Sequence, residues 1–103
     1  MIARIWRGTV ALPNGDAYAQ YMKTTGVADY SATPGNRGVW MLRRDIGEKT
    51  EFMMLTLWES IDAVKAFAGE NPEVAVLYPN DHRYLIEYDD VASHFVVEEH
   101  VSP

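Results

Sequence analysis

Residues 52–60 read Phe52-Met53-Met54-Leu55-Thr56-Leu57-Trp58-Glu59-Ser60. The first seven are apolar, aromatic or β-branched, which favours a β-strand, and Ser60 is a typical helix cap. Side chains alternate across a strand, so one face would carry Phe52, Met54, Thr56 and Trp58, and the other Met53, Leu55 and Leu57. Both faces are apolar, whereas a strand with one face in water alternates apolar with polar residues. We therefore expect a central strand covered on both sides.

The composition is typical of one globular domain spanning residues 1–103, with 48% hydrophobic and 23% charged residues. Nine basic and fifteen acidic residues give a formal net charge of −6. This charge disfavours nucleic acid and anionic membranes as partners, because both select basic surfaces. The chain has no cysteine, so we expect no disulfide, no thiolate nucleophile and no cysteine-based metal site.

The N-terminal residues carry no export signal, because Arg4 and Arg7 interrupt the apolar run that a signal peptide needs. No segment approaches the ~20 apolar residues of a membrane-spanning helix. We therefore expect a soluble cytoplasmic protein with no membrane partner.

Three further segments have the alternation and residue types of β-strands: Ile2–Gly8, Gly38–Arg44 and Ala92–Glu99. A polar stretch at residues 45–49 predicts a hairpin between the second strand and the strand at 52–58. Residues 27–37 are predicted to form a loop, in which Pro34-Gly35 fits the centre of a type II turn.

Two helices are predicted between the strands. The first runs from about Asp16 to Thr25 and is ended by Gly26 in the left-handed conformation. The second begins after Ser60 and ends at Gly69. Residues 71–77 predict one or two further helical turns, and residues 80–88 predict a short helix or an irregular segment over the sheet edge.

The resulting order, β-α-β-β-α-β, predicts an α+β protomer with the ferredoxin-like arrangement and an antiparallel sheet. Right-handed crossovers place the first and third strands side by side in the middle of the sheet. Two helices cover only one face, so the other would expose large apolar groups, including Trp6 or Trp40. An exposed apolar face of this kind marks an interface. We expect a homodimer through the sheet face.

Several stretches of the chain resemble the antibiotic-biosynthesis-monooxygenase-like family: residues 1–8, 25–26, 34–38, 57–60 and 67–69. The resemblance extends over nearly the whole chain. It implies a dimeric α+β barrel, in which a ferredoxin-like protomer packs its sheet on the sheet of a partner. The family contains cofactor-free oxygenases, haem degraders and members of unknown role.

The haem-degrading branch pairs an Asn on strand one and a Trp at the end of strand three with a haem-ligating His on the following helix. Trp58 matches the Trp position. Strand one offers Trp6 and Arg7 where the Asn would lie, and residues 61–69 contain no His. One match of three disfavours haem degradation, and we expect no cofactor.

Five aromatic residues are candidates for a substrate pocket between the sheet and the helices: Trp58, Trp6, Tyr21, Tyr78 and Phe67. Together with neighbouring apolar side chains they would form an apolar cavity with a few polar handles, the usual form of a small-molecule site. Core packing explains most of them equally well. Trp58 serves either purpose, because its buried N–H needs a partner in both cases.

Three polar residues are candidates for catalysis. Asn36 and Arg37 precede the second strand, where an amide and a guanidinium would orient an oxyanion. His82 is the best general-base candidate, because Asp81 beside it would orient the ring. A turn residue, a solvated charge and a surface histidine are the alternatives. No histidine pair has metal-site spacing, so no metal is expected.

Two functions are compatible with these residues. The first is a cofactor-independent monooxygenase acting on a small aromatic or polyketide-like substrate, because such chemistry needs little beyond a dry pocket, a base and donors that hold an anion. The second is a non-catalytic small-molecule-binding or stress-related dimeric module, because the fold does not fix the function.

Overall fold

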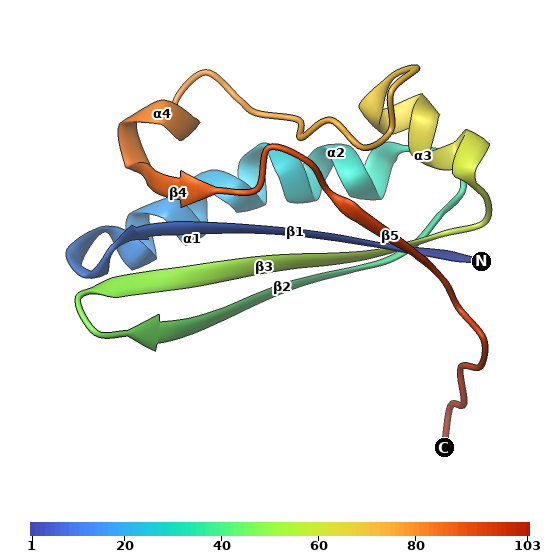
Figure 1. Cartoon of the computed structure of the whole chain (residues 1–103), viewed down its shortest axis with the longest axis horizontal. Helices are drawn as coiled ribbons and strands as arrows, with labels where there is room; N and C mark the ends of the chain where they lie inside the picture. Colours follow the sequence, from blue (N-terminus) through green and yellow to red (C-terminus); the bar gives the residue numbers. More distant parts are fainter.

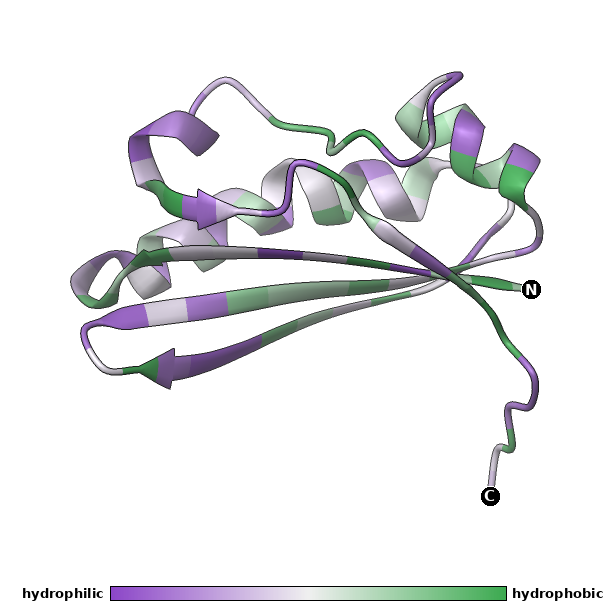
Figure 2. Ribbon diagram, viewed as in Figure 1, coloured by the Kyte–Doolittle hydropathy of each residue, from purple (hydrophilic) through white to green (hydrophobic).

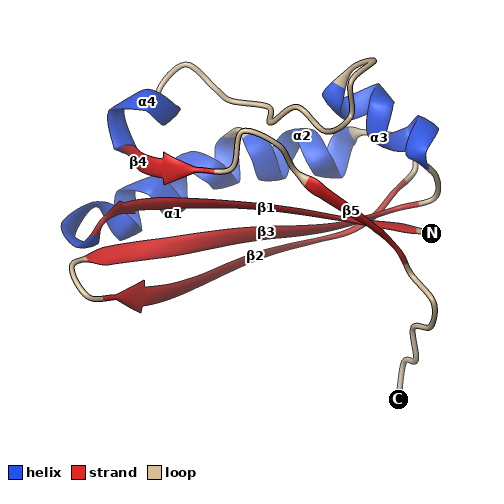
Figure 3. Ribbon diagram, viewed as in Figure 1, coloured by secondary structure: helices blue, strands red, loops and turns tan.

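The strand at the centre of the fold contains the predicted residues 52–58. In the computed structural model, which describes all 103 residues, β3 extends from Lys49 to Trp58. It pairs antiparallel with β1 (Ile2–Ala11) on one side and with β2 (Asn36–Ile46) on the other. The helices lie on one face of this sheet, so the molecule has two layers (Figure 1, Figure 3).

Two short strands complete the sheet at the free edge of β1. β4 (Leu85–Tyr88) and β5 (Ser93–Val96) pair antiparallel with different parts of β1. The order is β2-β3-β1-β4, with β5 also beside β1. The first and third predicted strands are therefore adjacent in the middle of the sheet, which confirms the ferredoxin-like α+β arrangement.

The helical elements are η1 (Leu12–Asn14), α1 (Gly15–Thr24), α2 (Gly26–Ala32), α3 (Ile61–Ala68) and α4 (Asp81–Tyr84). The predicted cap of α3 is confirmed, because the Ser60 hydroxyl accepts a hydrogen bond of 3.2 Å from the Ala63 N–H. The Pro34-Gly35 turn is also present, with Gly35 at a φ of +91°.

The expected loop over residues 27–37 and the left-handed stop at Gly26 are wrong. Gly26 is the first residue of α2 and has no positive φ. A Cβ atom at Gly26 would lie 3.2 Å from Met22 Cε and 3.8 Å from Tyr78 Cε2. Gly26 is therefore small because of close packing, a reason that the sequence alone does not reveal.

The helical turns expected at residues 71–77 are reduced to a single turn, in which the Val74 N–H donates to the Asn71 carbonyl at 3.1 Å, and no helix continues from it. Residues 69–80 connect α3 to α4. Val74 makes a single β-bridge with Val91, and the Ala75 N–H donates to the Asp90 carbonyl at 3.0 Å. The middle of this connection is hydrophobic (Figure 2). Pairing with residues 90–92 therefore replaces helical hydrogen bonding.

The two faces of the sheet differ in burial. On β3, the side chains of even-numbered residues from 50 to 58 are buried against the helices, and the odd-numbered ones are half-buried on the opposite face. Trp6 belongs to the covered face and is 5% exposed, whereas Trp40 is on the open face and 44% exposed. The protomer therefore covers only one of the two apolar faces of β3.

Candidate functional site

A small cavity lies between the sheet and the helices, where a substrate pocket is expected. Its volume is about 10 Å³, which is room for roughly one water molecule. Strand, helix and loop residues line it: Arg4, Trp6, Met22, Gly26, Tyr30, Val76, Tyr78 and Asp81. The lining is largely apolar and aromatic, and Arg4 and Asp81 are its charged residues.

The most unusual of these groups is the guanidinium of Arg4 on the covered face of β1. The residue is 2% exposed. Its Nη2 donates to the Val74 carbonyl at 3.3 Å, and its Cζ lies 5.5 Å from the centre of the Phe67 ring. Its Nε is buried and has no hydrogen-bond partner. The four ion pairs of the structure all join other residues, so no carboxylate neutralises this buried charge.

His94 lies directly opposite Arg4 on the neighbouring strand β5. Its ring is partly exposed, but its Nε2 atom is buried and has no partner. Burial lowers the pKa of His94 below its ordinary value, the positive charge of Arg4 lowers it further, and Glu73 acts in the opposite direction. The imidazole is therefore neutral at neutral pH, which is the form in which it accepts a proton.

An aromatic wall stands beside Arg4. The rings of Tyr30 and Phe67 are 4.4 Å apart, and those of Trp58 and Phe67 are 5.8 Å apart. The Trp58 Nε1 donates to Thr56 Oγ1 at 2.8 Å, so the indole is satisfied within the core. Burial raises the pKa of the Tyr30 hydroxyl, and Arg4 partly offsets the rise. Tyr30 is therefore a protonated donor next to the Arg4 charge.

Asp81 is the other buried charged residue on the cavity, at 2% exposure. Its Oδ1 accepts from the Tyr18 hydroxyl at 3.0 Å, and its Oδ2 accepts from the Tyr78 N–H at 2.6 Å. Burial, followed by the charge of Asp81, raises the pKa of Tyr18. Asp81 therefore links α1 to the connection at residues 69–80. Both of its carboxylate oxygens are used in these hydrogen bonds, so the carboxylate does not orient His82.

The structure brings four of the five predicted pocket aromatics to this interior. Trp6 and Tyr78 line the cavity, while Trp58 and Phe67 stand in the aromatic wall. Tyr21 lies elsewhere: its hydroxyl accepts from the Asn80 N–H at 2.9 Å, and its ring is 6.0 Å from that of Tyr84.

The three predicted catalytic residues do not line the cavity. Arg37 is on the surface, with a 57% exposed side chain that pairs with Glu59. The Asn36 side chain bonds to the backbone of Gly38, accepting from its N–H at 3.1 Å. His82 is exposed on α4. Asn36 and Arg37 therefore have visible structural roles where β2 begins.

Sequence reasoning missed Arg4, His94 and Tyr30. The sequence did contain a signal for Arg4, because this residue lies between Ile2 and Trp6 on one face of the strand. A charged side chain is rarely buried between two apolar ones, so its position could have indicated a special role. Tyr30 lies in the helix that the sequence did not predict. The importance of His94 comes from the register of β5 against β1, which short strands do not specify.

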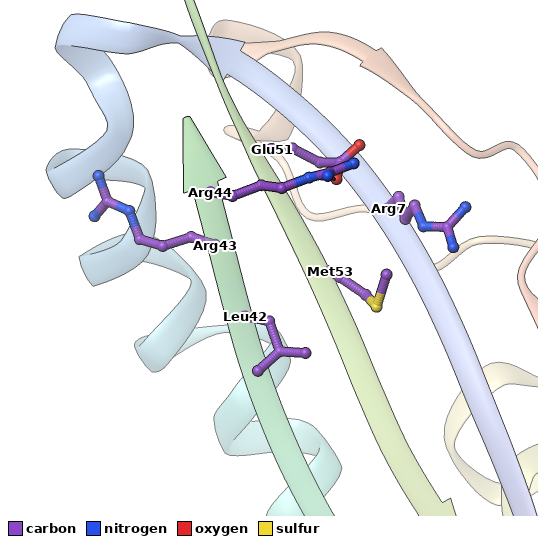
Figure 4. Close-up of a pocket in the computed structure, with 6 residues that line it drawn as sticks. All are labelled: Arg7, Leu42, Arg43, Arg44, Glu51 and Met53. Atoms are coloured by element: carbon purple, nitrogen blue, oxygen red, sulfur yellow. Dashed lines mark hydrogen bonds and ion pairs between the residues drawn. The ribbon is translucent and has the colours of Figure 1, made fainter. Parts of the chain in front are cut away.

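The largest concavity lies on the open sheet face and not in this interior. It has a volume of about 480 Å³ and is lined by Arg7, Leu42, Arg43, Arg44, Glu51 and Met53 (Figure 4). Arg44 pairs with Glu51 at 2.8 Å, and Arg43 turns towards α1, where it pairs with Asp16. This depression belongs to the apolar face that the protomer leaves uncovered.

No three His, Asp or Glu side chains of the structure lie close enough together to hold a metal ion. None of the helices has the length and hydrophobicity required to span a membrane.

Comparison with solved structures identifies the fold. The chain matches no family profile, and no curated protein is detectably similar in sequence. Solved structures are similar over their full length. The haem degrader MhuD from Mycobacterium tuberculosis has 21% identity and a TM-score of 0.69, with 99% of this chain and 100% of that chain covered.

Two other similar structures are monooxygenases by name. A Bacillus cereus protein provisionally named an antibiotic biosynthesis monooxygenase has 16% identity and a TM-score of 0.67, covering 99% of this chain and 97% of that one. The ActVA-Orf6 monooxygenase of Streptomyces coelicolor, solved with nanaomycin D, has 13% identity and a TM-score of 0.63, covering 99% and 91%. The chain has the antibiotic-biosynthesis-monooxygenase fold. At these identities the likeness concerns the fold alone.

The lowered pKa of His94 predicts a pH-dependent stability. Because the folded-state pKa lies below the unfolded value of 6.5, the unfolded chain binds more protons once the pH falls below that value. As the pH falls from the unfolded pKa to the folded-state pKa, the free energy of unfolding should therefore decrease. Above the unfolded pKa, the whole contribution of His94 to stability is retained. We expect urea unfolding at about pH 7.5 and about pH 5.5 to show a larger loss for wild type than for His94→Gln.

His100→Gln, in the exposed tail, is the matched control and should lose as much stability as wild type. Equal losses in wild type and His94→Gln would show that His94 titrates alike in the folded and unfolded states.

Proposed function

We propose that this protein is a cofactor-independent monooxygenase of the antibiotic-biosynthesis-monooxygenase-like family, which oxidises a small, electron-rich aromatic or polyketide-like molecule between the sheet and the helices. The observation that carries the proposal is the pairing of His94, whose buried Nε2 has no partner, with the buried and uncompensated charge of Arg4. Arg4 lines the cavity, and His94 lies behind it on β5 with a lowered pKa. A base next to a fixed positive charge favours the formation of a substrate anion.

The chain's own residues supply the steps that such a reaction needs. His94 Nε2 accepts a proton from the substrate, and the Arg4 guanidinium stabilises the anion that forms. The anion then reduces O₂ directly. In an anthrone, the ring methylene loses two hydrogens and gains one oxygen atom, and the second oxygen atom leaves as water with these hydrogens. The reaction therefore balances without an external reductant.

Access to the interior requires movement of the connection at residues 69–80. The cavity of about 10 Å³ is far smaller than the ~300 Å³ or more of an ordinary ligand pocket. Val76 and Tyr78 of this connection form one wall. The Tyr78 hydroxyl donates to Asp29 at 2.5 Å, and the Val74–Val91 bridge holds the other end. Displacement of this segment would enlarge the site without disturbing the sheet.

The residues do not fit a haem held by a histidine of α3, the arrangement that the family resemblance implies for haem degraders. α3 consists of residues Ile61–Ala68 and contains no His. The interior beside it is filled by the rings of Tyr30, Trp58 and Phe67. The proposed reaction therefore has no haem-dependent step.

The second candidate is a non-catalytic small-molecule-binding dimeric module of the same fold. The small interior cavity favours it, because a binding protein that closes around its ligand needs no access for O₂. Turnover distinguishes the two candidates.

The oxygenase proposal predicts that 1,8-dihydroxy-9-anthrone is converted to the corresponding anthraquinone, with one O₂ consumed for each product molecule. His94→Phe should lower kcat by about 100-fold or more, the usual size of general base catalysis. Product absorbance and an oxygen electrode measure the two quantities, and the rate without enzyme is subtracted.

His100→Phe is the control and should behave like wild type. The sequence-based candidate base is tested in the same assay: loss of activity in His82→Gln but not in His94→Phe would contradict the assignment. Absence of turnover across a panel of anthrones and hydroquinones would favour the binding module.

We further propose a homodimer that covers the open sheet face. Trp40 and Leu42 are both 44% exposed there, and Phe95 is 54% exposed. The half-buried side chains of Leu55 and Leu57 continue the same apolar surface. A second copy packed sheet against sheet would bury this surface, and removal of the apolar side chains from water would favour such a pair.

The dimer proposal predicts that wild type sediments as a dimer at micromolar concentration and that Trp40→Glu is a folded monomer, because a buried carboxylate in the interface is costly. Ile61→Glu is the matched control, since Ile61 is 39% exposed on α3, and should remain dimeric. Analytical ultracentrifugation and circular dichroism measure assembly and folding. A monomeric wild type, or a dimeric Trp40→Glu, would contradict the proposed interface.

A further inference from the structure

Two buried side-chain atoms in the whole chain lack a hydrogen-bond partner, Arg4 Nε and His94 Nε2. They belong to residues that face each other across β1 and β5. Residues directly opposite in an antiparallel pair have Cβ atoms about 4.5–5.5 Å apart, so both side chains share the covered face. Unsatisfied buried polar atoms are rare, so two of them on residues that are paired across neighbouring strands call for an explanation.

The charge of Arg4 determines what kind of group would pair with these atoms. An arginine stays protonated even when burial lowers its pKa, as it does here. The nearest buried carboxylate on the cavity, Asp81, already accepts from Tyr18 and from the Tyr78 backbone. A buried charge without a counter-charge costs several kcal/mol, so an anion bound beside Arg4 would stabilise the site.

The residues around Arg4 indicate the shape and polarity of the rest of the ligand. Around Arg4 stand the rings of Phe67, Tyr30 and Trp6. The unpartnered buried nitrogen atoms are only two, Arg4 Nε and His94 Nε2, whereas a desolvated phosphate needs hydrogen bonds to all of its oxygens. A single anionic oxygen on a flat aromatic body matches both the donors and the walls.

We propose that Arg4 Nε–H and His94 Nε2–H together bind the anionic oxygen of an aromatic enolate, phenolate or carboxylate. The inference rests on the proposed function only in placing the ligand in the same interior site, and binding is measured without turnover. A neutral imidazole carries its proton on one of its two nitrogens. With the proton on Nδ1, Nε2 accepts the proton of a neutral substrate; with the proton on Nε2, it donates to a ligand that is already ionised. The two residues therefore determine the charge of the ligand that this protein accepts.

Calorimetric titration without oxygen tests the charge requirement. 2-Hydroxy-1,4-naphthoquinone is an enolate at neutral pH, and 2-methoxy-1,4-naphthoquinone is its neutral analogue of nearly the same shape. We expect the enolate to bind about tenfold or more tightly, the usual effect of hydrogen bonds to a charged group. 1-Naphthoate is the carboxylate probe, and tight binding of naphthoate alone assigns the site to carboxylates instead of enolates.

Variants assign the effect to the two residues. Arg4→Met should lose the preference for the anion, and Arg83→Met, on the exposed surface of α4, should keep it. Should Arg4→Met not fold, the His94 series decides: His94→Gln retains a donor near the Nε2 position and should bind the enolate more tightly than His94→Phe.

The pKa of His94 distinguishes recognition of the ligand by this residue from a purely structural role. Besides Arg4 on β1, Glu73 of the connection faces His94, and these are the charges that act on its pKa. An anion bound between Arg4 and His94 should raise the pKa of His94 in an NMR titration. A purely structural His94 would not respond to the ligand.

Equal affinity for the enolate and its neutral analogue, or no binding of any of the three probes, would overturn the proposal. So would an anion preference that survives in Arg4→Met. Selective binding of the anion without turnover of anthrones would support the anion site and reject the oxygenase. Turnover of anthrones without a preference for the anion would support the oxygenase and reject the anion site.

Discussion

The buried positive charge of Arg4 is the constraint on which the interior of this protein depends. It sits on the covered face of the central strand β1, and its surroundings are arranged around it: a carbonyl from the connection at residues 69–80, the ring face of Phe67 from α3, and His94 from β5. These contacts bring three separate parts of the chain together. They do not neutralise the charge, and this unpaired charge is the reason for proposing a binding site here.

The second constraint is the two apolar faces of β3. The even-numbered face is buried by the helices, and the odd-numbered face is left half-buried together with Trp40 on β2. A domain of this size has helices enough for one face only. In the proposed function the interior site and the open face therefore have different tasks: the first would surround a small molecule, and the second would be covered by a partner sheet. The largest concavity, beside Arg7 and Arg44, lies on the second face.

The architecture was predictable from the sequence because it is encoded locally. Alternation identified β1 and β2, the apolar character of both faces identified β3, Ser60 marked the start of α3, and the order of elements determined the sheet. The site was less predictable. Trp58 and Phe67 were identified as aromatics near the strand end, but Arg4, Tyr30 and His94 become neighbours only through long-range pairing. The sequence-based choice of His82 followed its local polar context, and the structure leaves that residue exposed.

A crystal structure of the protein with 2-hydroxy-1,4-naphthoquinone tests the central claim most directly. The account predicts the enolate oxygen within hydrogen-bond distance of both Arg4 Nε and His94 Nε2, with the ring system against Phe67 and the connection at residues 69–80 displaced. A ligand in the depression beside Arg7 and Arg44 on the open sheet face, with Arg4 Nε unchanged, would contradict it.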